Sequence, residues 1–200
     1  MTVRIYVEGG FEGSKTACRK AFRTFLEKVE GVGSFQVIAS GDRASTYRNF
    51  CTALKQHRGD FVVLLVDAEE EVRSAPWQHL RARPGDGWTR PNGATEEQAQ
   101  LMVQVMESWF LADRVALSRY YGQGFLSNSL PGQPNIELIP KQRVFDALAH
   151  ATRQTQKGEY HKTRHGFDLL ELIDPVLVGA ASSHARDFFL VLNRRAQQSN

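Results

Sequence analysis

The longest unbroken apolar run of the chain spans residues 61–66, with the sequence FVVLLV. A run of this length that is rich in Val predicts a strand buried on both faces, as in the middle of a parallel sheet. Four of the next five residues, 67–71, are acidic. Because ligands of open α/β sheets bind beyond the carboxyl ends of the strands, Asp67 and Glu69 stand where a functional site is expected. Taken alone, these residues also fit a solvated acidic turn.

Two further strands, at residues 4–7 and 35–39, alternate with two helices ahead of this run. Ser14 is the expected N-cap of the first helix, and Ser45 or Thr46 is the expected N-cap of the second. The β-α-β-α-β order predicts an α/β fold in which parallel strands are joined by right-handed crossovers and helices cover the faces of the sheet.

The segment after the third strand carries two different signals. Residues 72–93 are rich in Pro and Gly and predict a long irregular loop, which in a compact domain is usually functional or poorly ordered. Thr95 then opens a capping-box pattern, and apolar residues at helical spacing predict a deeply buried helix that ends near Ala112. Glu107 falls at the edge of the apolar arc of this helix, where a carboxylate needs a partner or contact with water.

The remainder of the chain is expected to be mostly helical. We divide the chain into an α/β core at residues 1–122, which includes the loop 72–93, and a helical extension at residues 123–200 packed on it as one compact domain. Within this extension we expect a loop at 124–140 and helices at 141–151, at 167–172, after Pro175 and at 184–195.

Composition and charge narrow the class of protein. No segment approaches the roughly 18 apolar residues of a membrane helix, and the N-terminus has no signal-peptide pattern, so we expect a cytoplasmic protein without membrane contact. The net charge is only +3, but two basic segments, 72–90 and 141–164, flank the acidic centre. They fit either a surface that holds a polyanion or solvated loops.

Acidic residues follow the first strand as well as the third. Glu8 ends the first strand and precedes two glycines, and Glu12 follows four residues later. Strands one and three lie close together in a doubly wound sheet, so their acidic ends meet in one crevice. Clustered carboxylates without His or Cys favour Mg²⁺ or Mn²⁺, and these ions stabilise phosphoryl transfer.

This spacing resembles the Toprim domain of topoisomerases, primases and the overcoming-lysogenization-defect nucleases. The Glu8-Gly9 pair matches the acid-Gly pair after the first strand, and Glu12 matches the further acid of the nuclease branch. Asp67 and Glu69 match the Asp-x-Asp motif, with Glu69 departing from the commoner Asp. The resemblance implies a Toprim-like, Rossmann-like sheet that is mainly parallel.

The rest of the chain is similar to a short, stand-alone Toprim-related family known as domain of unknown function 4276. The resemblance covers nearly the whole chain and implies an ABC-type ATPase as a partner and anti-phage defence as the setting. The segments that carry it are residues 106–113, which resemble the third acidic motif of the nucleases, and residues 139–141, 160–162, 167–170 and 173–175.

The resulting site hypothesis assigns a role to each candidate. The expected metal ligands are Glu8, Glu12, Asp67, Glu69 and Glu107. Glu8, Lys141 and Lys162 are the expected catalytic residues, and the expected nucleic-acid contacts are Arg73, Arg81, Arg83 and Arg90.

Simpler interpretations stay open for several of these residues. Glu12 also fits a favourable charge at a helix start, and either lysine alone also fits an ordinary surface residue. Ser182-Ser183-His184 lacks the strand-turn-helix context of a hydrolase nucleophile, so we discount it as a catalytic site.

Two functions are therefore compatible with the sequence. The first is a Mg²⁺- or Mn²⁺-dependent nuclease that hydrolyses phosphodiesters of DNA or RNA. The second is a non-catalytic Toprim-like subunit that senses or recruits for a partner ATPase, which the small size, the missing nucleotide-binding loop and the Glu69 departure favour. The sequence specifies neither the oligomeric state nor the choice between DNA and RNA.

Overall fold

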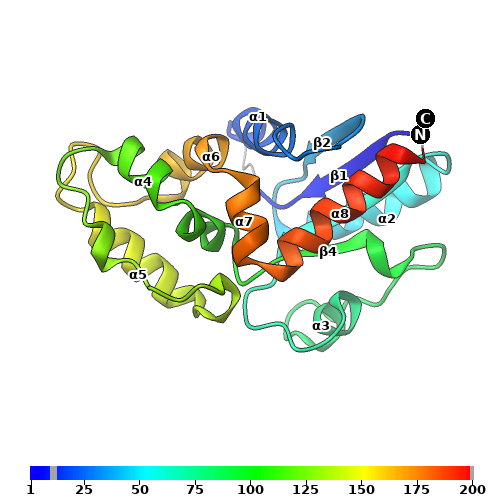
Figure 1. The fold of residues 1–200 in the computed structure, drawn as a ribbon. Helices are drawn as coiled ribbons and strands as arrows, with labels where there is room; N and C mark the ends of the chain where they lie inside the picture. Colours follow the sequence, from blue (N-terminus) through cyan, green and yellow to red (C-terminus); the bar gives the residue numbers. More distant parts are fainter. Residues whose placement is uncertain (10–12, 199–200) are drawn as a thin grey trace.

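Strand β3 (Phe61–Asp67) lies inside a four-stranded, all-parallel sheet with the order β2-β1-β3-β4 (Figure 1). The computed structural model describes residues 1–9 and 13–198. Every residue of β3 is buried, as the apolar run predicts. The predicted α/β fold, with a parallel sheet flanked by helices and a helical C-terminal part, is confirmed.

The register of the strands brings their carboxyl ends to one edge of the sheet. Val7, the last residue of β1 (Val3–Val7), pairs with Ala39 of β2 (Phe35–Ala39) on one side and with Leu65 of β3 on the other. The amide of Glu8 donates to the carbonyl of Leu65 at 3.4 Å. The residues that follow β1 and β3 therefore start side by side.

Successive residues of the central strands face two separate hydrophobic cores. Val63 and Leu65 pack on one face of the sheet with α1 (Lys15–Leu26), α6 (Lys162–Leu172), α7 (Pro175–Ala181) and α8 (Ser183–Gln197). Val62, Leu64 and Val66 pack on the other face with α2 (Arg43–Gln56) and α3 (Pro76–Ala82). Alternation of side chains along a strand produces this division, because neighbouring residues point to opposite faces.

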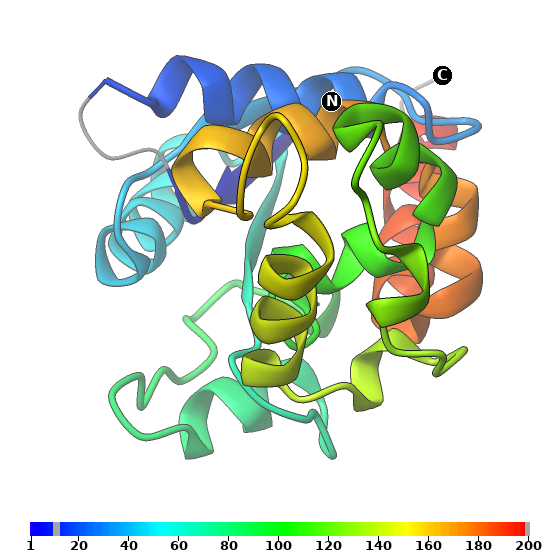
Figure 2. The same ribbon diagram turned by 90° about the vertical axis from the view of Figure 1, so that its left-hand side faces the viewer.

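The helical C-terminal part surrounds the end of the sheet where the site lies. In Figure 1 the arrowhead of β1 points toward α4, α5 and α6, which gather beyond the carboxyl ends of the strands. Figure 2 shows α6 lying along α1 at the top of this region. Side chains from α6 can therefore approach residues that follow β1 and β3.

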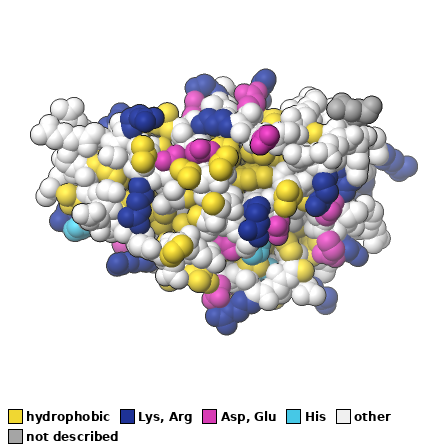
Figure 3. All heavy atoms as spheres, viewed as in Figure 1, with side chains coloured by type: hydrophobic (Ala, Val, Ile, Leu, Met, Phe, Trp, Pro, Cys, Tyr) yellow, Lys and Arg dark blue, Asp and Glu magenta, His cyan; other side chains and the backbone are white. Residues whose placement is uncertain are grey.

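The face formed by α7 and α8 mixes apolar and charged side chains (Figure 3). Leu172, at the end of α6, Val176 and Leu177 of α7 and Leu190 of α8 are exposed. This face therefore presents no field of a single charge. Among the described residues, no helix combines the length and apolar composition needed to cross a bilayer.

The predicted helix from Thr95 to Ala112 is wrong. The capping box of Thr95 and Gln98 is present, but it opens a single 3₁₀ turn, and strand β4 (Ala99–Met102) follows at once. The residues of β4 pair with Leu64–Asp67 of β3. Strand β3 is buried on both faces and needs a partner strand on each edge, because its backbone groups would otherwise be buried without hydrogen bonds. Strand β4 supplies the partner on the edge opposite β1.

Smaller corrections concern the helices. Residues 72–93 are not irregular throughout, since they contain the two-turn helix α3 (Pro76–Ala82). The N-cap of α2 is Asp42, whose side chain accepts from the amide of Ser45, rather than Ser45 or Thr46. Helix α6 begins at Lys162, five residues before the predicted start.

The remaining elements are α1 (Lys15–Leu26), α2 (Arg43–Gln56), η1 (Glu96–Gln98), η2 (Met106–Ala112), α4 (Arg114–Tyr121), η3 (Ser127–Ser129), η4 (Ile136–Leu138), α5 (Lys141–Thr152), α6 (Lys162–Leu172), α7 (Pro175–Ala181) and α8 (Ser183–Gln197), the η elements being 3₁₀ helices.

Candidate active site

A pocket of about 400 Å³ opens at the carboxyl ends of the parallel strands. The loops after β1 and β2, the ends of β3 and β4, the 3₁₀ helix η2 and helix α6 all contribute to it, so segments far apart in the sequence converge here. Its lining comprises Glu8, Gly9, Gly41, Asp42, Arg43, Asp67, Met102, Met106, Lys162 and Phe167.

Asp67 is the buried carboxylate at the centre of this site. Its side chain accepts a hydrogen bond from the amide of Met106 at 2.8 Å, and Nζ of Lys162 lies 3.8 Å from its other oxygen. Burial raises the pKa of Asp67 to about 7; Lys162 opposes the shift, while the charges of Glu107 and Glu8 add to it. The site therefore holds less positive charge than its carboxylates need.

Glu107 is fully buried beside Asp67, in the 3₁₀ helix η2. One carboxylate oxygen accepts a hydrogen bond from the hydroxyl of Tyr160 at 3.1 Å and lies 3.5 Å from Nζ of Lys162. The other oxygen, Oε2, is buried and has no hydrogen-bond partner. A buried carboxylate oxygen without a partner is costly and marks a place where a cation would be stabilised.

Lys162 links the two buried carboxylates from the start of α6. Burial alone would lower the pKa of Lys162, but the neighbouring carboxylates outweigh that effect and raise it above its ordinary value. The ammonium group therefore stays charged. Because about half of the side chain is exposed, at 55%, Lys162 can also reach an anion at the mouth of the pocket.

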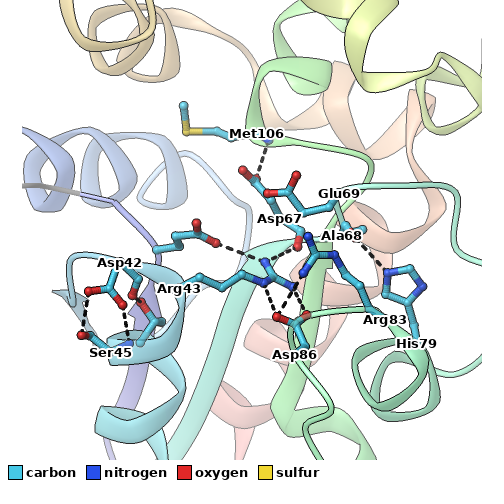
Figure 4. A network of polar contacts seen from close by, with 12 residues as sticks. Asp42, Arg43, Ser45, Asp67, Ala68, Glu69, His79, Arg83, Asp86 and Met106 are labelled. Carbon is cyan, nitrogen blue, oxygen red and sulfur yellow. Dashed lines mark hydrogen bonds and ion pairs between the residues drawn. The ribbon is translucent and has the colours of Figure 1, made fainter.

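Arg43 is a further member of the site that the sequence did not single out (Figure 4). Its guanidinium donates to the main-chain carbonyl of Asp67 at 2.6 Å and to the carboxylate of Glu8 at 3.2 Å. It also forms two hydrogen bonds with Asp86 and lies over the ring of Trp88. Arg43 follows the carboxyl end of β2, and this position at the functional edge of the sheet is the signal that could have identified it.

Glu8 lies between Arg43 and the acidic cluster. Burial raises the pKa of the Glu8 carboxyl, Arg43 works against this shift, and the charge of Glu69 adds to it. The mutual influence of Glu8, Asp67 and Glu69 means that these acids share one electrostatic environment, as their strand positions predict.

Glu69 has an unusual backbone conformation. Its φ is +71°, in the left-handed region that non-glycine residues seldom adopt, and its amide donates to the carbonyl of Gln104 at 2.7 Å. Its carboxylate forms an ion pair with Nζ of Lys141. The structure thus brings Lys141 to the edge of the cluster, paired with Glu69.

The structure brings some of the metal ligands predicted from the sequence close together. Asp67 and Glu107 contact Lys162, and Glu8 pairs with Arg43 nearby. Glu69 pairs with Lys141, and Glu12 lies outside the described residues. Within residues 1–9 and 13–198, no group of three or more His, Cys, Asp or Glu side chains is already arranged to hold a metal ion. Basic side chains stand among the carboxylates in this conformation.

The predicted nucleic-acid contacts differ in how far they are free to bind. Arg73 pairs with Glu71 at 2.8 Å, Arg90 pairs with Glu96, and Arg83 pairs with Asp86 at 3.1 Å. Arg81 is exposed on α3. The structure thus separates Arg81 from the other predicted contacts, whose charge is compensated by a neighbouring carboxylate.

Ser182, Ser183 and His184 serve the fold. The two hydroxyls donate to the carboxylate of Glu137 at 2.6 and 3.0 Å, and the amide of His184 donates to it at 2.8 Å. The His184 imidazole also lies 3.0 Å from this carboxylate, and its hydrogen bond, with those of the Ser182 hydroxyl and the His184 amide, outweighs the effect of burial and lowers the pKa of Glu137 to about 2. Both serines bond to Glu137 rather than to an imidazole, so this cluster lacks the nucleophile-base pair of a hydrolase.

The fold and the site together define an α/β protein with a cluster of carboxylates and lysines beyond the strand ends. The chain matches Domain of unknown function (DUF4276) over residues 7–193, and it belongs to that family. No curated protein and no solved structure matches the chain.

Proposed function

We propose that this protein is a Toprim-like, metal-dependent nuclease that hydrolyses phosphodiesters with Mg²⁺ or Mn²⁺. The observation that carries the proposal is the convergence of Asp67 and Glu107 on Lys162, with one buried oxygen of Glu107 unpaired and with Glu8 near enough for its charge to act on Lys162. The adjacency of β1 and β3 supports the resemblance to Toprim domains, because it sets Glu8 beside the Asp67-Ala68-Glu69 motif.

The residues of the site fit a divalent cation. Asp67 and Glu8 have raised pKa values, which a cation of higher charge would reverse, and all the candidate ligands are carboxylates, as Mg²⁺ and Mn²⁺ prefer. Asp67 and Glu107 would hold the ion, with Glu8 and Glu69 at its border. When bound, such an ion neutralises charge on phosphate oxygens and activates water.

The other side chains then have separate tasks. Lys162, which is half exposed, binds a non-bridging phosphate oxygen as a point charge. Lys141 does the same from the opposite side once its carboxylate partner, Glu69, is engaged elsewhere. Arg43 orients the carboxylate of Glu8, which accepts a proton from the attacking water.

The test is a cleavage assay on purified protein. We expect degradation of plasmid, single-stranded DNA or tRNA in Mn²⁺ or Mg²⁺ and no degradation in EDTA. Contamination is controlled by an Asp67→Asn variant purified in parallel. Absence of cleavage of every nucleic acid, even with the ABC-type ATPase partner present, would contradict the nuclease proposal.

A second candidate is a non-catalytic subunit that senses or recruits for a partner ATPase. One observation favours it: Glu8, Glu69 and the Asp67–Glu107 pair each have a basic side chain in contact, namely Arg43, Lys141 and Lys162. These contacts supply part of the compensating positive charge without metal. This alternative predicts stable complex formation with the ATPase and no cleavage in any metal.

A further inference from the structure

The pocket beside the acidic cluster has two chemically different walls. The carboxylates and Lys162 form one wall and account for the proposed chemistry. The apolar side chains of the lining form the other: Met102 and Met106 are buried, and Phe167 of α6 is partly buried. Phosphodiester hydrolysis makes no use of an apolar wall, so this part of the pocket needs a separate explanation.

Two glycines, Gly9 and Gly41, line this part of the pocket. A Cβ atom added to Gly9 would lie 3.3 Å from the sulfur of Cys18 and 3.7 Å from the ring of Phe167, which places the bare backbone of Gly9 against that ring. Gly9 and Gly41 both have positive φ, at +128° and +86°, and they exchange backbone hydrogen bonds of 2.9 and 3.1 Å. A Cβ atom added to Gly41 would meet nothing within 4 Å, so the loop after β2 leaves open space in the pocket, while the loop after β1 packs closely on Phe167.

The polar groups of the lining are already occupied within the protein. Asp42 accepts from the amide and hydroxyl of Ser45 at 2.7 and 2.9 Å. Arg43 is bonded to Glu8, Asp86 and the carbonyl of Asp67, and the amides and carbonyls of the two glycines bond to each other. A ligand on the apolar side would be held by shape and by contact with the aromatic ring and the thioethers. Few protein groups there are free to form hydrogen bonds with it.

The size of the pocket limits the occupant. At about 400 Å³ it falls toward the lower end of small-molecule sites. A planar nucleobase with its sugar fits such a volume, whereas the bases of an intact duplex remain stacked and cannot enter unless a nucleotide is extruded. Stacking on an aromatic side chain is a general means of holding an unpaired base, because every base has a π-face.

We propose that this pocket takes one unpaired nucleobase next to the phosphate under attack, without preference among the bases. The inference rests on the proposed nuclease function and specifies its substrate class: strands that offer an unpaired nucleotide, as in single-stranded DNA or RNA, frayed ends and bulges. Fully paired, blunt duplex is excluded, because its bases cannot reach Phe167 and the methionines.

The first test varies the ligand. Fluorescence anisotropy would measure binding of a labelled single strand, in Ca²⁺ and in EDTA, against competitors: the same backbone with abasic residues throughout, a blunt two-stranded duplex, and free nucleoside monophosphates. We expect the intact single strand to bind about tenfold or more tightly than the abasic strand and the duplex, from the usual effect of base stacking. Homopolymers of different bases should bind within a few-fold of one another.

The other outcomes separate the two proposals. Equal binding of abasic and intact strands would mean that the backbone alone is recognised, which overturns the base pocket and leaves the nuclease proposal standing. A strong preference for one base, or equal binding of a free nucleotide and the strand, also overturns it. Failure of every nucleic acid to bind would overturn the nuclease proposal itself.

The second test varies the protein. Phe167→Ala should reduce the affinity for the intact strand toward that for the abasic strand and leave the abasic affinity unchanged. Phe145→Ala, in α5, is the matched control, because Phe145 is also partly buried and lies outside the lining of the pocket. If Phe167→Ala weakened binding of both strands equally, the ring would act through the fold, and the inference would be wrong.

Discussion

Arg43 and Asp86 form a two-pronged ion pair, with Nε to Oδ1 at 2.8 Å and Nη2 to Oδ2 at 2.7 Å (Figure 4). Both side chains are largely buried, at 14% and 2% exposure. The ring of Trp88, which stacks on that of Tyr47, lies against the same guanidinium. Through this pair, the segment that follows α3 is fixed to the residue that orients Glu8.

Replacing Asp86 by Asn should destabilise the protein strongly. Removing the charge of Asp86 leaves the buried Arg43 with only its longer contact to the Glu8 carboxylate, and we expect a loss of about 2–4 kcal/mol in the free energy of unfolding. Urea denaturation would measure it. The control is Glu96→Gln, which breaks the exposed Arg90 pair and should cost less than about 1 kcal/mol. Equal effects of the two substitutions would show that the buried pair contributes no more than an exposed one.

Asp67 should make the metal-free protein less stable as the pH rises. Its folded-state pKa of about 7 lies above the ordinary value of 3.8, so the folded state holds the proton more tightly than the unfolded state does. The contribution is fully present below about pH 4 and is lost as the pH rises to about 7, amounting to at most roughly 4 kcal/mol. Thermal melting in EDTA across this range should show the decline.

The variant Asp67→Asn should show a smaller decline and melt above the wild type at about pH 8, although the loss of attraction to Lys162 offsets part of the gain. Asp113→Asn is the contrasting control. The oxygens of Asp113 accept hydrogen bonds from the amides of Ala116 and Asp174, so this substitution should lower stability at every pH. A lower melting temperature for Asp67→Asn at high pH would make Asp67 a structural residue.

The sequence predicts this centre well because local signals and the sheet geometry agree there. The valine-rich run before Asp67 is a strand, and the acids at Glu8 and Asp67 follow neighbouring strands, as parallel pairing requires. Glu107 was predicted on the edge of a helix and is instead fully buried in a 3₁₀ helix after β4. Periodicity alone does not distinguish a buried helix from a short buried strand followed by a tight turn.

Arg43 shows a different limit of sequence reasoning. The residues next to Arg43 in the sequence do not predict its contacts with Glu8 and Asp86, because these partners lie 35 and 43 positions away. Only the order of the strands brings the three together. Long-range ion pairs of this kind depend on the tertiary arrangement, while the strand and its terminal acid are encoded locally.

Glu69→Gly and Glu69→Ala should separate backbone strain from side-chain function. Both remove the pair with Lys141, but only Gly adopts the φ of +71° without a steric cost. We expect the Gly variant to be about 1 kcal/mol more stable than the Ala variant, as measured by urea denaturation. An Ala variant of equal or greater stability would mean that this conformation carries no strain.

Arg81 and Arg83 should behave differently in nucleic-acid binding. Arg81→Ala should leave the melting temperature unchanged and reduce the slope of log K against log salt by about 0.7–0.9, as for the loss of one phosphate contact. Arg83→Ala should change this slope less and lower stability, because its charge is already paired with Asp86. Equal slopes for Arg81→Ala and the wild type would remove Arg81 from the binding surface.

Glu8→Gln should abolish turnover and preserve the fold. In the wild type, Arg43 donates to the Glu8 carboxylate at 3.2 Å, and the Gln amide keeps an oxygen that can accept this hydrogen bond. The melting temperature in EDTA should therefore stay close to the wild-type value. The charge that attracts a cation and takes a proton from water is lost, and a loss of about 10²–10⁴-fold in turnover is the usual consequence. Single-strand binding measured by anisotropy should survive, since the apolar wall and Lys162 are unchanged.

Glu30→Gln, which changes an exposed carboxylate away from the pocket, controls for the loss of one negative charge. Wild-type turnover in Glu8→Gln would show that Glu8 is only a structural partner of Arg43. Asp67 and Glu107, the two carboxylates in contact with Lys162, would then remain as candidate metal ligands.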